Sequence, residues 1–104
     1  SFTGELSFAV AVPTRYGLEE VWPNPLESRT TSVSHVVVVL DEERAVTLDL
    51  RDMLGRVVGV VHRGVLPAGR NVLRFDASGL PPGRYFYALR GMDRIFTRGM
   101  VLVR

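Results

Sequence analysis

Short apolar runs alternate with turn residues along the whole chain. Glycine and proline recur at short intervals, and valine dominates between them. No stretch of about ten residues combines helical periodicity with good helix formers, so no long helix is expected. About seven short strands, with turn signals roughly every 8–12 residues, are typical of an antiparallel sandwich. The expected fold class is therefore all-β, an immunoglobulin-like antiparallel β-sandwich.

The individual strands follow from this pattern. They are expected at residues 6–12, 30–40, 45–51, 56–62, 71–76, 84–90 and 94–103. Residues 45–51 alternate most cleanly, because Val46, Leu48 and Leu50 face one way and polar residues face the other. Residues 14–20 are interpreted as a linker, 52–55 as a tight hairpin turn and 63–70 as a loop. Gly99 is expected to mark a bulge in the last strand.

Two packed sheets require an apolar core between them. The run from Val36 to Leu40 suits a buried strand. The large side chains expected in the core are Trp22, Leu48, Leu50, Leu73, Phe75, Tyr85, Leu89 and Phe96. Burial of each contributes about 1.5–3 kcal/mol of transfer free energy.

Composition narrows the class of protein. The chain has 104 residues, of which 46% are hydrophobic and 23% charged, as in a single folded domain. No apolar run approaches the roughly 20 residues of a membrane helix, so no membrane insertion is expected. The start of the chain does not resemble a signal peptide, so an export signal would lie on a longer parent chain.

The sequence contains neither cysteine nor lysine, and arginine supplies all 13 basic residues. The lack of cysteine excludes disulfides, thiolate zinc sites and cysteine nucleophiles. The lack of lysine excludes Schiff-base chemistry and a phosphate-loop lysine. The net charge is only +2, which gives no strong electrostatic attraction to nucleic acid.

The remaining polar residues show no pattern typical of an active site. Asp49 is interpreted as part of a solvated strand face and Asp52 as a turn residue. His35 and His62 lie on separate predicted strands without neighbours at metal-ligand spacing. No serine stands in a nucleophile elbow. We therefore expect no catalytic residue, no metal site and no cofactor, and the chain is interpreted as a non-enzyme.

Aromatic residues leave one binding alternative open. Arginines interleaved with Tyr85, Phe86 and Tyr87 are better explained by a sandwich core than by nucleic-acid binding. The faces of Trp22 and the tyrosines could also stack on sugar rings. A carbohydrate-binding or purely structural immunoglobulin-like module of a secreted enzyme is therefore the alternative function.

Four motifs occur in a familiar order. They are Trp22-Pro23-Asn24-Pro25, Asp52-Met53-Leu54-Gly55-Arg56, Leu80-Pro81-Pro82-Gly83-Arg84-Tyr85, and the run Arg98-Gly99-Met100-Val101-Leu102-Val103-Arg104. Together they resemble the type A C-terminal sorting domain of the type IX secretion system, over residues 18–104. The chain departs from the family pattern at two places. An aromatic or other apolar residue often follows the first motif, and Leu26 fills that role only modestly, while arginine replaces lysine in the terminal strand.

The resemblance implies a non-catalytic secretion signal. Such a domain directs an attached N-terminal cargo through the periplasm and across the outer membrane, to the cell surface or the medium, in Bacteroidota. The implied partners are the type IX outer-membrane translocon and a sortase-like peptidase. Residues 1–17 would then be a linker or cargo tail, residues 18–104 the sorting domain, and residues 14–20 the cleavage region.

The resemblance also assigns roles to residues. Translocon recognition is expected from Arg98, Met100, Val101, Leu102, Val103 and Arg104. Turn geometry is expected from Pro23, Asn24, Pro25, Asp52, Gly55, Arg56, Leu80, Pro81, Gly83 and Tyr85. A terminal strand with an exposed end suggests strand addition or capture of the C-terminal carboxylate by the partner. Open edge strands also favour weak homodimerisation.

Overall fold

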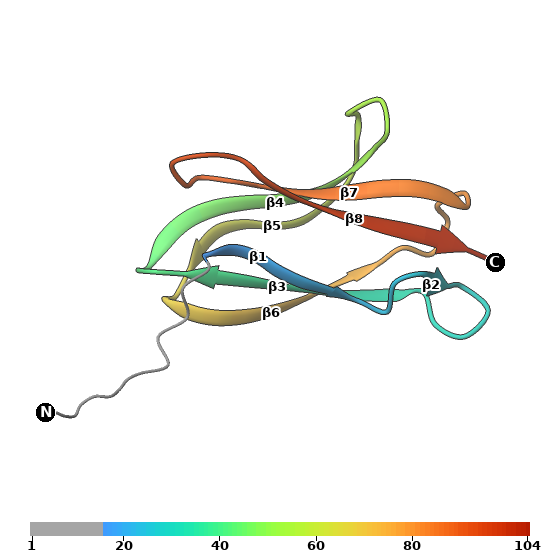
Figure 1. The fold of residues 1–104 in the computed structure, drawn as a ribbon, viewed down its shortest axis with the longest axis horizontal. Helices are drawn as coiled ribbons and strands as arrows, with labels where there is room; N and C mark the ends of the chain where they lie inside the picture. Colours follow the sequence, from blue (N-terminus) through green and yellow to red (C-terminus); the bar gives the residue numbers. More distant parts are fainter. Residues whose placement is uncertain (1–15) are drawn as a thin grey trace, which may run out of the picture.

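The computed structural model describes residues 16–104, which form two facing β-sheets (Figure 1). The strands are β1 (Gly17–Trp22), β2 (Leu26–Glu27), β3 (Val33–Leu40), β4 (Arg44–Asp52), β5 (Val57–Leu66), β6 (Gly69–Asp76), β7 (Gly83–Arg90) and β8 (Phe96–Val103). One sheet has the order β1-β3-β6 and the other β2-β8-β7-β4-β5. The strand predicted at 6–12 lies outside the described residues.

This strand order confirms the immunoglobulin-like sandwich. Strands β3 and β6 take the places of B and E in one sheet, and β4, β7 and β8 take those of C, F and G in the other. Strand β5 adds a C′ strand beside β4. Neither β1 nor β2 was predicted from the sequence. Strand β2 has two residues and runs parallel to β8, whereas the other neighbours are antiparallel.

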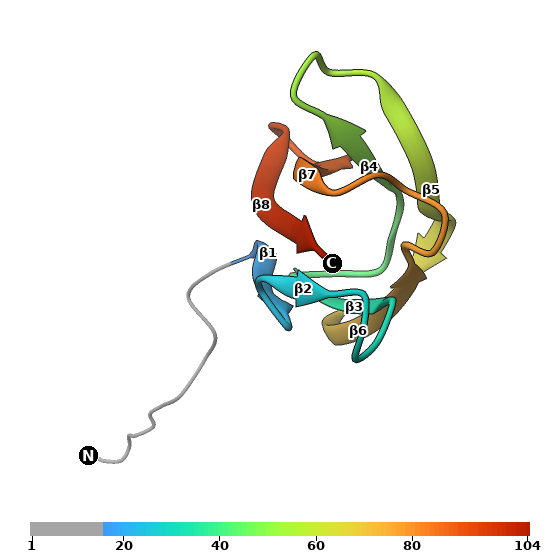
Figure 2. The ribbon, with the colours of Figure 1, turned by 90° about the vertical axis from the view of Figure 1, so that its right-hand side faces the viewer.

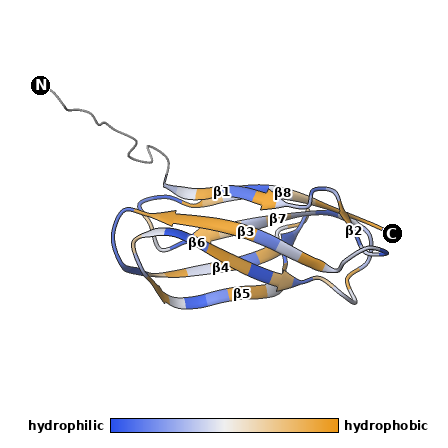
Figure 3. Cartoon of the chain, turned by 90° about the horizontal axis from the view of Figure 1, so that it is seen from below, coloured by the Kyte–Doolittle hydropathy of each residue, from blue (hydrophilic) through white to orange (hydrophobic). Residues whose placement is uncertain are grey.

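The core lies between the sheets, and most of its predicted members are there. Leu48, Leu50 and Leu89 are fully buried, and Tyr85 is 6% exposed. The run from Val36 to Leu40 is buried along its whole length, as its apolar stretch predicted (Figure 3). Partly buried side chains complete the core: Leu73, Phe75 and Phe96.

The predicted core position of Trp22 is wrong. Its side chain is only half-buried, and its ring stacks on that of His35 with the centroids 5.1 Å apart. Val21 packs against the core instead. Because neighbouring residues of a strand point to opposite faces, Trp22 lies on the outer face of the small sheet.

The predicted linker at 14–20 is wrong from Gly17 onwards, because these residues form β1. Its pairing with β3 skips Glu19, which makes a β-bulge. The bulge allows Leu18 and Val21, three positions apart, to pack against the same core. This spacing breaks the two-residue alternation that identifies strands in a sequence.

The predicted loop at 63–70 is also wrong. Strand β5 continues to Leu66, where it still pairs with Arg44, and β6 begins at Gly69. The pairing of β4 with β5 skips Val58 and Val61, and both side chains pack against the core. These two irregularities curl β5, so that β5 and β6 close one side of the sandwich while β1 and β8 lie at the other (Figure 2).

Two strand glycines have opposite surroundings. A Cβ atom on Gly59 would lie 2.5 Å from the Phe75 ring, which packs there across the closed side of the sandwich. A Cβ atom on Gly99 would meet no atom within 4 Å. Gly99 pairs directly with Phe86 in an unbroken register, so the bulge predicted there is wrong. The packing of the fold thus requires glycine at position 59 but not at position 99.

These surroundings predict different costs for the same substitution. Gly59→Ala should lower the free energy of unfolding by about 1–3 kcal/mol, because the ring must move out of a packed position. Gly99→Ala should change it by no more than about 0.5 kcal/mol, since the added methyl group enters open space. Urea denaturation of the two variants measures both values. Equal losses would contradict the packing of Phe75 on Gly59.

Candidate functional site

Strand β8 carries the residues expected to be recognised, and it alternates between core and surface. Met100 and Leu102 are buried, at 1% and 3% exposure. Val101 is 37% exposed, and Arg104 is also exposed. Val103 is half-buried. The six predicted recognition residues therefore divide into a buried pair that holds the strand and exposed side chains that a partner could contact.

Both edges of β8 are occupied near its end. Strand β7 pairs with β8 from Phe96 to Leu102. On the other edge, Leu26 and Glu27 of β2 pair with Leu102 and Val103, and the Ser28 N–H donates to the Val103 carbonyl at 2.9 Å. An added strand could bind this part of β8 only by displacing β2. This part of β8 therefore offers exposed side chains and no free strand edge.

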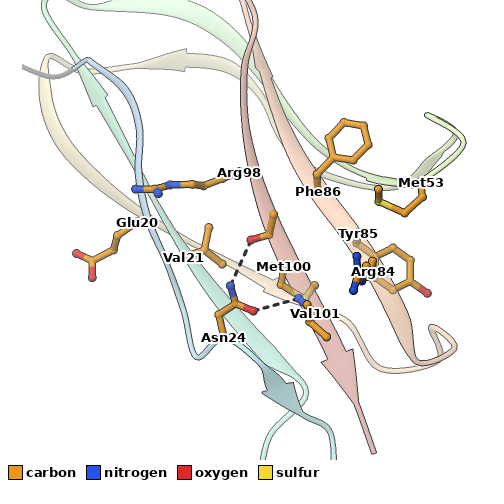
Figure 4. A pocket seen from close by; sticks show the side chains of 11 residues that line it. Glu20, Val21, Asn24, Met53, Arg84, Tyr85, Phe86, Arg98, Met100 and Val101 are labelled. Atoms are coloured by element: carbon orange, nitrogen blue, oxygen red, sulfur yellow. Dashed lines mark hydrogen bonds between the residues drawn. The ribbon is translucent and has the colours of Figure 1, made fainter.

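Asn24 extends this second edge without a strand. Its side-chain Oδ1 accepts a hydrogen bond from the Val101 N–H at 3.1 Å, and its Nδ2 donates to the Gly99 carbonyl at 3.4 Å (Figure 4). The amide side chain thus makes the bonds that a neighbouring backbone would make. It lies between Pro23 and Pro25, and each proline follows a cis peptide bond. The Pro-Asn-Pro motif therefore joins β1, β2 and β8.

Arg98 connects the other half of β8 to β1. Its guanidinium donates to the backbone carbonyl of Glu19, the residue that forms the bulge in β1. The Glu19 and Glu20 carboxylates both bind Arg70 on β6 at 3.0 Å. The guanidinium of Arg98 is consequently held by a neutral carbonyl.

The Asp52–Gly55 turn is confirmed as a hairpin, and Asp52 organises it. One carboxylate oxygen accepts from the N–H groups of Leu54 and Arg56, at 2.9 and 3.0 Å. The other accepts from the Arg56 guanidinium at 2.8 Å. Gly55 adopts a φ of 84°, which favours glycine. Partial burial opposes ionisation of Asp52, but the bonds from Arg56 and Leu54 together lower its pKa.

Tyr85 forms a second fixed corner. Tyr85 lies near the start of β7, and its hydroxyl donates to the backbone carbonyl of Pro81, four residues earlier in the preceding turn. This is the tyrosine corner of immunoglobulin-like domains, where a tyrosine at the start of strand F binds back to the preceding turn. Leu80 packs against the core from the same turn. The Leu-Pro-Pro-Gly-Arg-Tyr motif therefore fixes the connection between the two sheets.

A hollow of about 640 Å³ crosses β8 at Gly99. Figure 4 shows its lining from both sides of that strand. The residues are Glu20, Val21, Asn24, Met53, Arg84, Tyr85, Phe86, Arg98, Gly99, Met100 and Val101. The terminal strand, the Pro-Asn-Pro motif, the hairpin and the tyrosine corner thus all contribute to one surface. The sequence did not predict this convergence, because the contributing segments are far apart along the chain.

Two buried polar groups were missed by the sequence reasoning. Asp49, expected on a solvated face, is 1% exposed and binds Arg51 at 2.8 Å and Arg90 at 3.3 Å. The hydrogen bond to Asp49 is the main cause that raises the pKa of Arg51. Ser34 is buried in the core, where its hydroxyl accepts from the Tyr87 hydroxyl at 2.7 Å. Burial raises the pKa of Tyr87.

Within residues 16–104, no three histidine or acidic side chains gather where they could hold a metal ion. No helix in this part of the chain is long and apolar enough to span a bilayer. The aromatics considered for sugar stacking are not an exposed row. Tyr85 and Tyr87 are buried, and Trp22 is stacked on His35.

Removal of the Asn24 amide should expose the edge of β8. Asn24→Ala is expected to cost about 0.5–1.5 kcal/mol of unfolding free energy, because the Val101 N–H and the Gly99 carbonyl lose their partner. Hydrogen exchange of the Val101 amide should accelerate more than that of Tyr87 in the sheet centre. Unchanged protection of Val101 would show that the side-chain bond does not hold the edge.

The lowered pKa of Asp52 predicts a pH dependence. A carboxylate whose folded pKa is depressed stabilises the fold above its unfolded pKa of about 3.9, and this stabilisation disappears as the pH falls through the folded pKa. Asp52→Asn should therefore be less stable than wild type at pH 7, and the difference should shrink toward pH 2. Urea denaturation at both pH values tests this. A difference independent of pH would assign the effect to hydrogen bonding without charge.

Comparison with known proteins identifies the family of the chain. The family model of the secretion system C-terminal sorting domain matches residues 20–103. Comparisons with curated proteins and with solved structures give no match. The matched range contains the Pro-Asn-Pro motif, the hairpin, the tyrosine corner and almost all of the terminal strand. The chain therefore belongs to the type IX secretion system C-terminal sorting domain family.

Proposed function

We propose that residues 18–104 are a non-catalytic signal that directs an N-terminally attached cargo across the outer membrane and onto the cell surface. The family match over residues 20–103 carries this proposal. The family implies export through the type IX machinery, and its sorting domains are not catalytic. The partners we propose are the outer-membrane translocon and a sortase-like peptidase, with residues 1–17 as the linker to the cargo.

The geometry of β8 suggests how a folded signal is recognised. Because Met100 and Leu102 are buried, the strand cannot leave the sheet without opening the core. The translocon therefore contacts a folded surface that includes the side chains of Arg98, Val101 and Arg104. Arginines at the rim of such a contact accelerate association with acidic surfaces. The buried pair determines where these side chains are placed.

The start of β1 narrows the proposed cleavage region. Residues from Gly17 onwards pair with β3, beginning with Gly17 opposite Val39. A peptidase needs extended, accessible backbone, and paired strand residues become accessible only by local unfolding. Cleavage within residues 14–20 is therefore expected before Gly17, which leaves the sandwich intact.

Export of a reporter tests the proposed function. A fluorescent protein with a general export signal is fused ahead of residues 1–104 and expressed in a host that has a type IX system. Fluorescence should reach the cell surface or the medium in that host and stay in the periplasm of a translocon-deficient strain. Retention in the periplasm of both strains would overturn the proposed sorting role.

A surface substitution tests recognition better than a deletion. Removal of residues 102–104 also takes Leu102 out of the core, so lost export would not distinguish unfolding from lost recognition. Arg104→Glu leaves the core intact and should lower export severalfold, because it reverses an exposed charge. Arg74→Glu, on the outer face of the other sheet, is the matched control. Equal effects of the two variants would exclude a specific role for Arg104.

A further inference from the structure

The hairpin between β4 and β5 presents apolar side chains to water from a rigid turn. Met53 is 64% exposed and Leu54 is 78% exposed. The turn that carries them is held through both carboxylate oxygens of Asp52 and by backbone bonds of Asp52 with Gly55 and Arg56. Large exposed apolar side chains contribute little to folding, and on a fixed turn they are typical of a contact surface.

Gly99 gives an independent sign that the nearby hollow is functional. Glycine weakens a strand, because it costs entropy and offers no side chain to pack. At this position no bulge, no positive φ and no neighbour within 4 Å of a Cβ atom requires it. Even the ring of Phe86, its direct partner across the strands, leaves that space open. A side chain here would instead fill the hollow where it crosses β8 (Figure 4).

The lining of the hollow favours one kind of occupant. Its apolar walls include Met53, half-buried Phe86 and Val101. Arg84 and Arg98 also line it, and neither forms an ion pair with a carboxylate among residues 16–104. The acidic residue of the lining, Glu20, is already bound to Arg70. The hollow therefore offers an apolar surface beside two arginines that have no carboxylate partner among residues 16–104, although Arg98 also donates to the Glu19 carbonyl.

We infer that this hollow is the docking site for an acidic segment of the translocation machinery, with an apolar side chain of that segment seated over Gly99. This inference rests on the proposed sorting function. The partner's apolar side chain packs between Phe86 and Val101, and its carboxylates bind Arg84 and Arg98. Because Gly99 has no side chain, the partner can approach the backbone of β8, as happens at strand glycines where another chain packs closely.

A membrane surface would respond in the opposite way to a change at Gly99. Arginines beside exposed apolar residues also suit anionic lipid, and an additional apolar side chain would strengthen binding to it. In a closed protein contact the same side chain occupies the partner's place and weakens binding. The sign of one substitution therefore distinguishes the two occupants.

The decisive variant is Gly99→Val, measured in the reporter fusion with the full chain. Valine favours strands, and its Cβ atom meets no neighbour within 4 Å here, so the melting temperature should stay equal or rise. Export should fall about tenfold or more, because the valine side chain conflicts sterically with the partner and a modest conflict weakens binding by that factor. Thr97→Val is the matched control, because Thr97 lies on the same face of β8 but outside the hollow. Its export should equal that of wild type.

Charge reversal tests the arginine contribution separately. Arg84→Glu should lower export severalfold, whereas Arg63→Glu should not. Arg63 is an exposed arginine on β5 that does not line the hollow and forms no ion pair among the described residues. Equal export of the two variants would show that the partner does not bind Arg84 through carboxylates, and the inferred acidic partner would be wrong.

Photo-crosslinking identifies the occupant. Phe86 is replaced by p-benzoylphenylalanine in the exporting host, and the crosslinked peptide is sequenced by mass spectrometry. We expect an acidic segment with apolar residues from an outer-membrane translocation component. A basic peptide, a lipid adduct or no adduct would overturn the inference.

Failure of the docking inference is distinguishable from failure of the sorting function. If the wild-type fusion is not exported, the proposed function fails. If it is exported, and Gly99→Val is exported as well as Thr97→Val or better, the docking site is wrong and the sorting function stands.

Discussion

The outer edge of the last strand is completed by one side-chain amide and a two-residue strand. An unpaired edge leaves backbone N–H and C=O groups without partners and invites pairing with other chains. Asn24 binds the backbone of β8 at Gly99 and Val101, and β2 continues the edge to Val103. The same strand brings Met100 and Leu102 into the core. The packing between the sheets and the surface that β8 presents therefore depend on this edge.

The other motifs fix the remaining borders of that surface. Asp52 closes the hairpin that carries Met53, and the Tyr85 hydroxyl ties the start of β7 to the preceding turn. Each motif consists largely of residues that hold backbone in place, while the exposed side chains beside them vary in chemistry from apolar to cationic. Under the proposed function, the signal is consequently the shape of the folded domain. Its short motifs are readable in the sequence because the fold requires them.

The strands in which apolar and polar residues alternate strictly were predicted from the sequence. Strands interrupted by a β-bulge were missed or given the wrong bounds. Strands β4 and β7 were predicted nearly to their ends, because their apolar residues recur at every second position. Strand β1 was missed because Glu19 shifts Leu18 and Val21 onto one face. The loop expected at 63–70 is occupied by the end of β5 and the start of β6. A one-residue shift of this kind reverses which face a side chain joins, as with Trp22.

The candidate site was predictable in its parts and not in its assembly. The terminal strand and the turn motifs were identified from the sequence. Their meeting around one hollow could not be, because the hydrogen bond from Val101 to Asn24 spans 77 positions. The burial of Asp49 was equally hidden, since its partner Arg90 lies on another strand. Gly99 could only be reinterpreted once its surroundings were known, because a strand glycine usually indicates a bulge.

The two ends of the described chain lie at opposite ends of the sandwich (Figure 1). Strand β1 starts at one end with Gly17, and β8 leads to Arg104 at the other. An eight-residue strand such as β8 is about 26 Å long. Gly17 and Arg104 are thus separated by roughly the length of one strand. In the proposed sorting function, a cargo attached ahead of β1 therefore joins the sandwich at the end opposite Arg104, and contacts with the end of β8 do not depend on the size of the cargo.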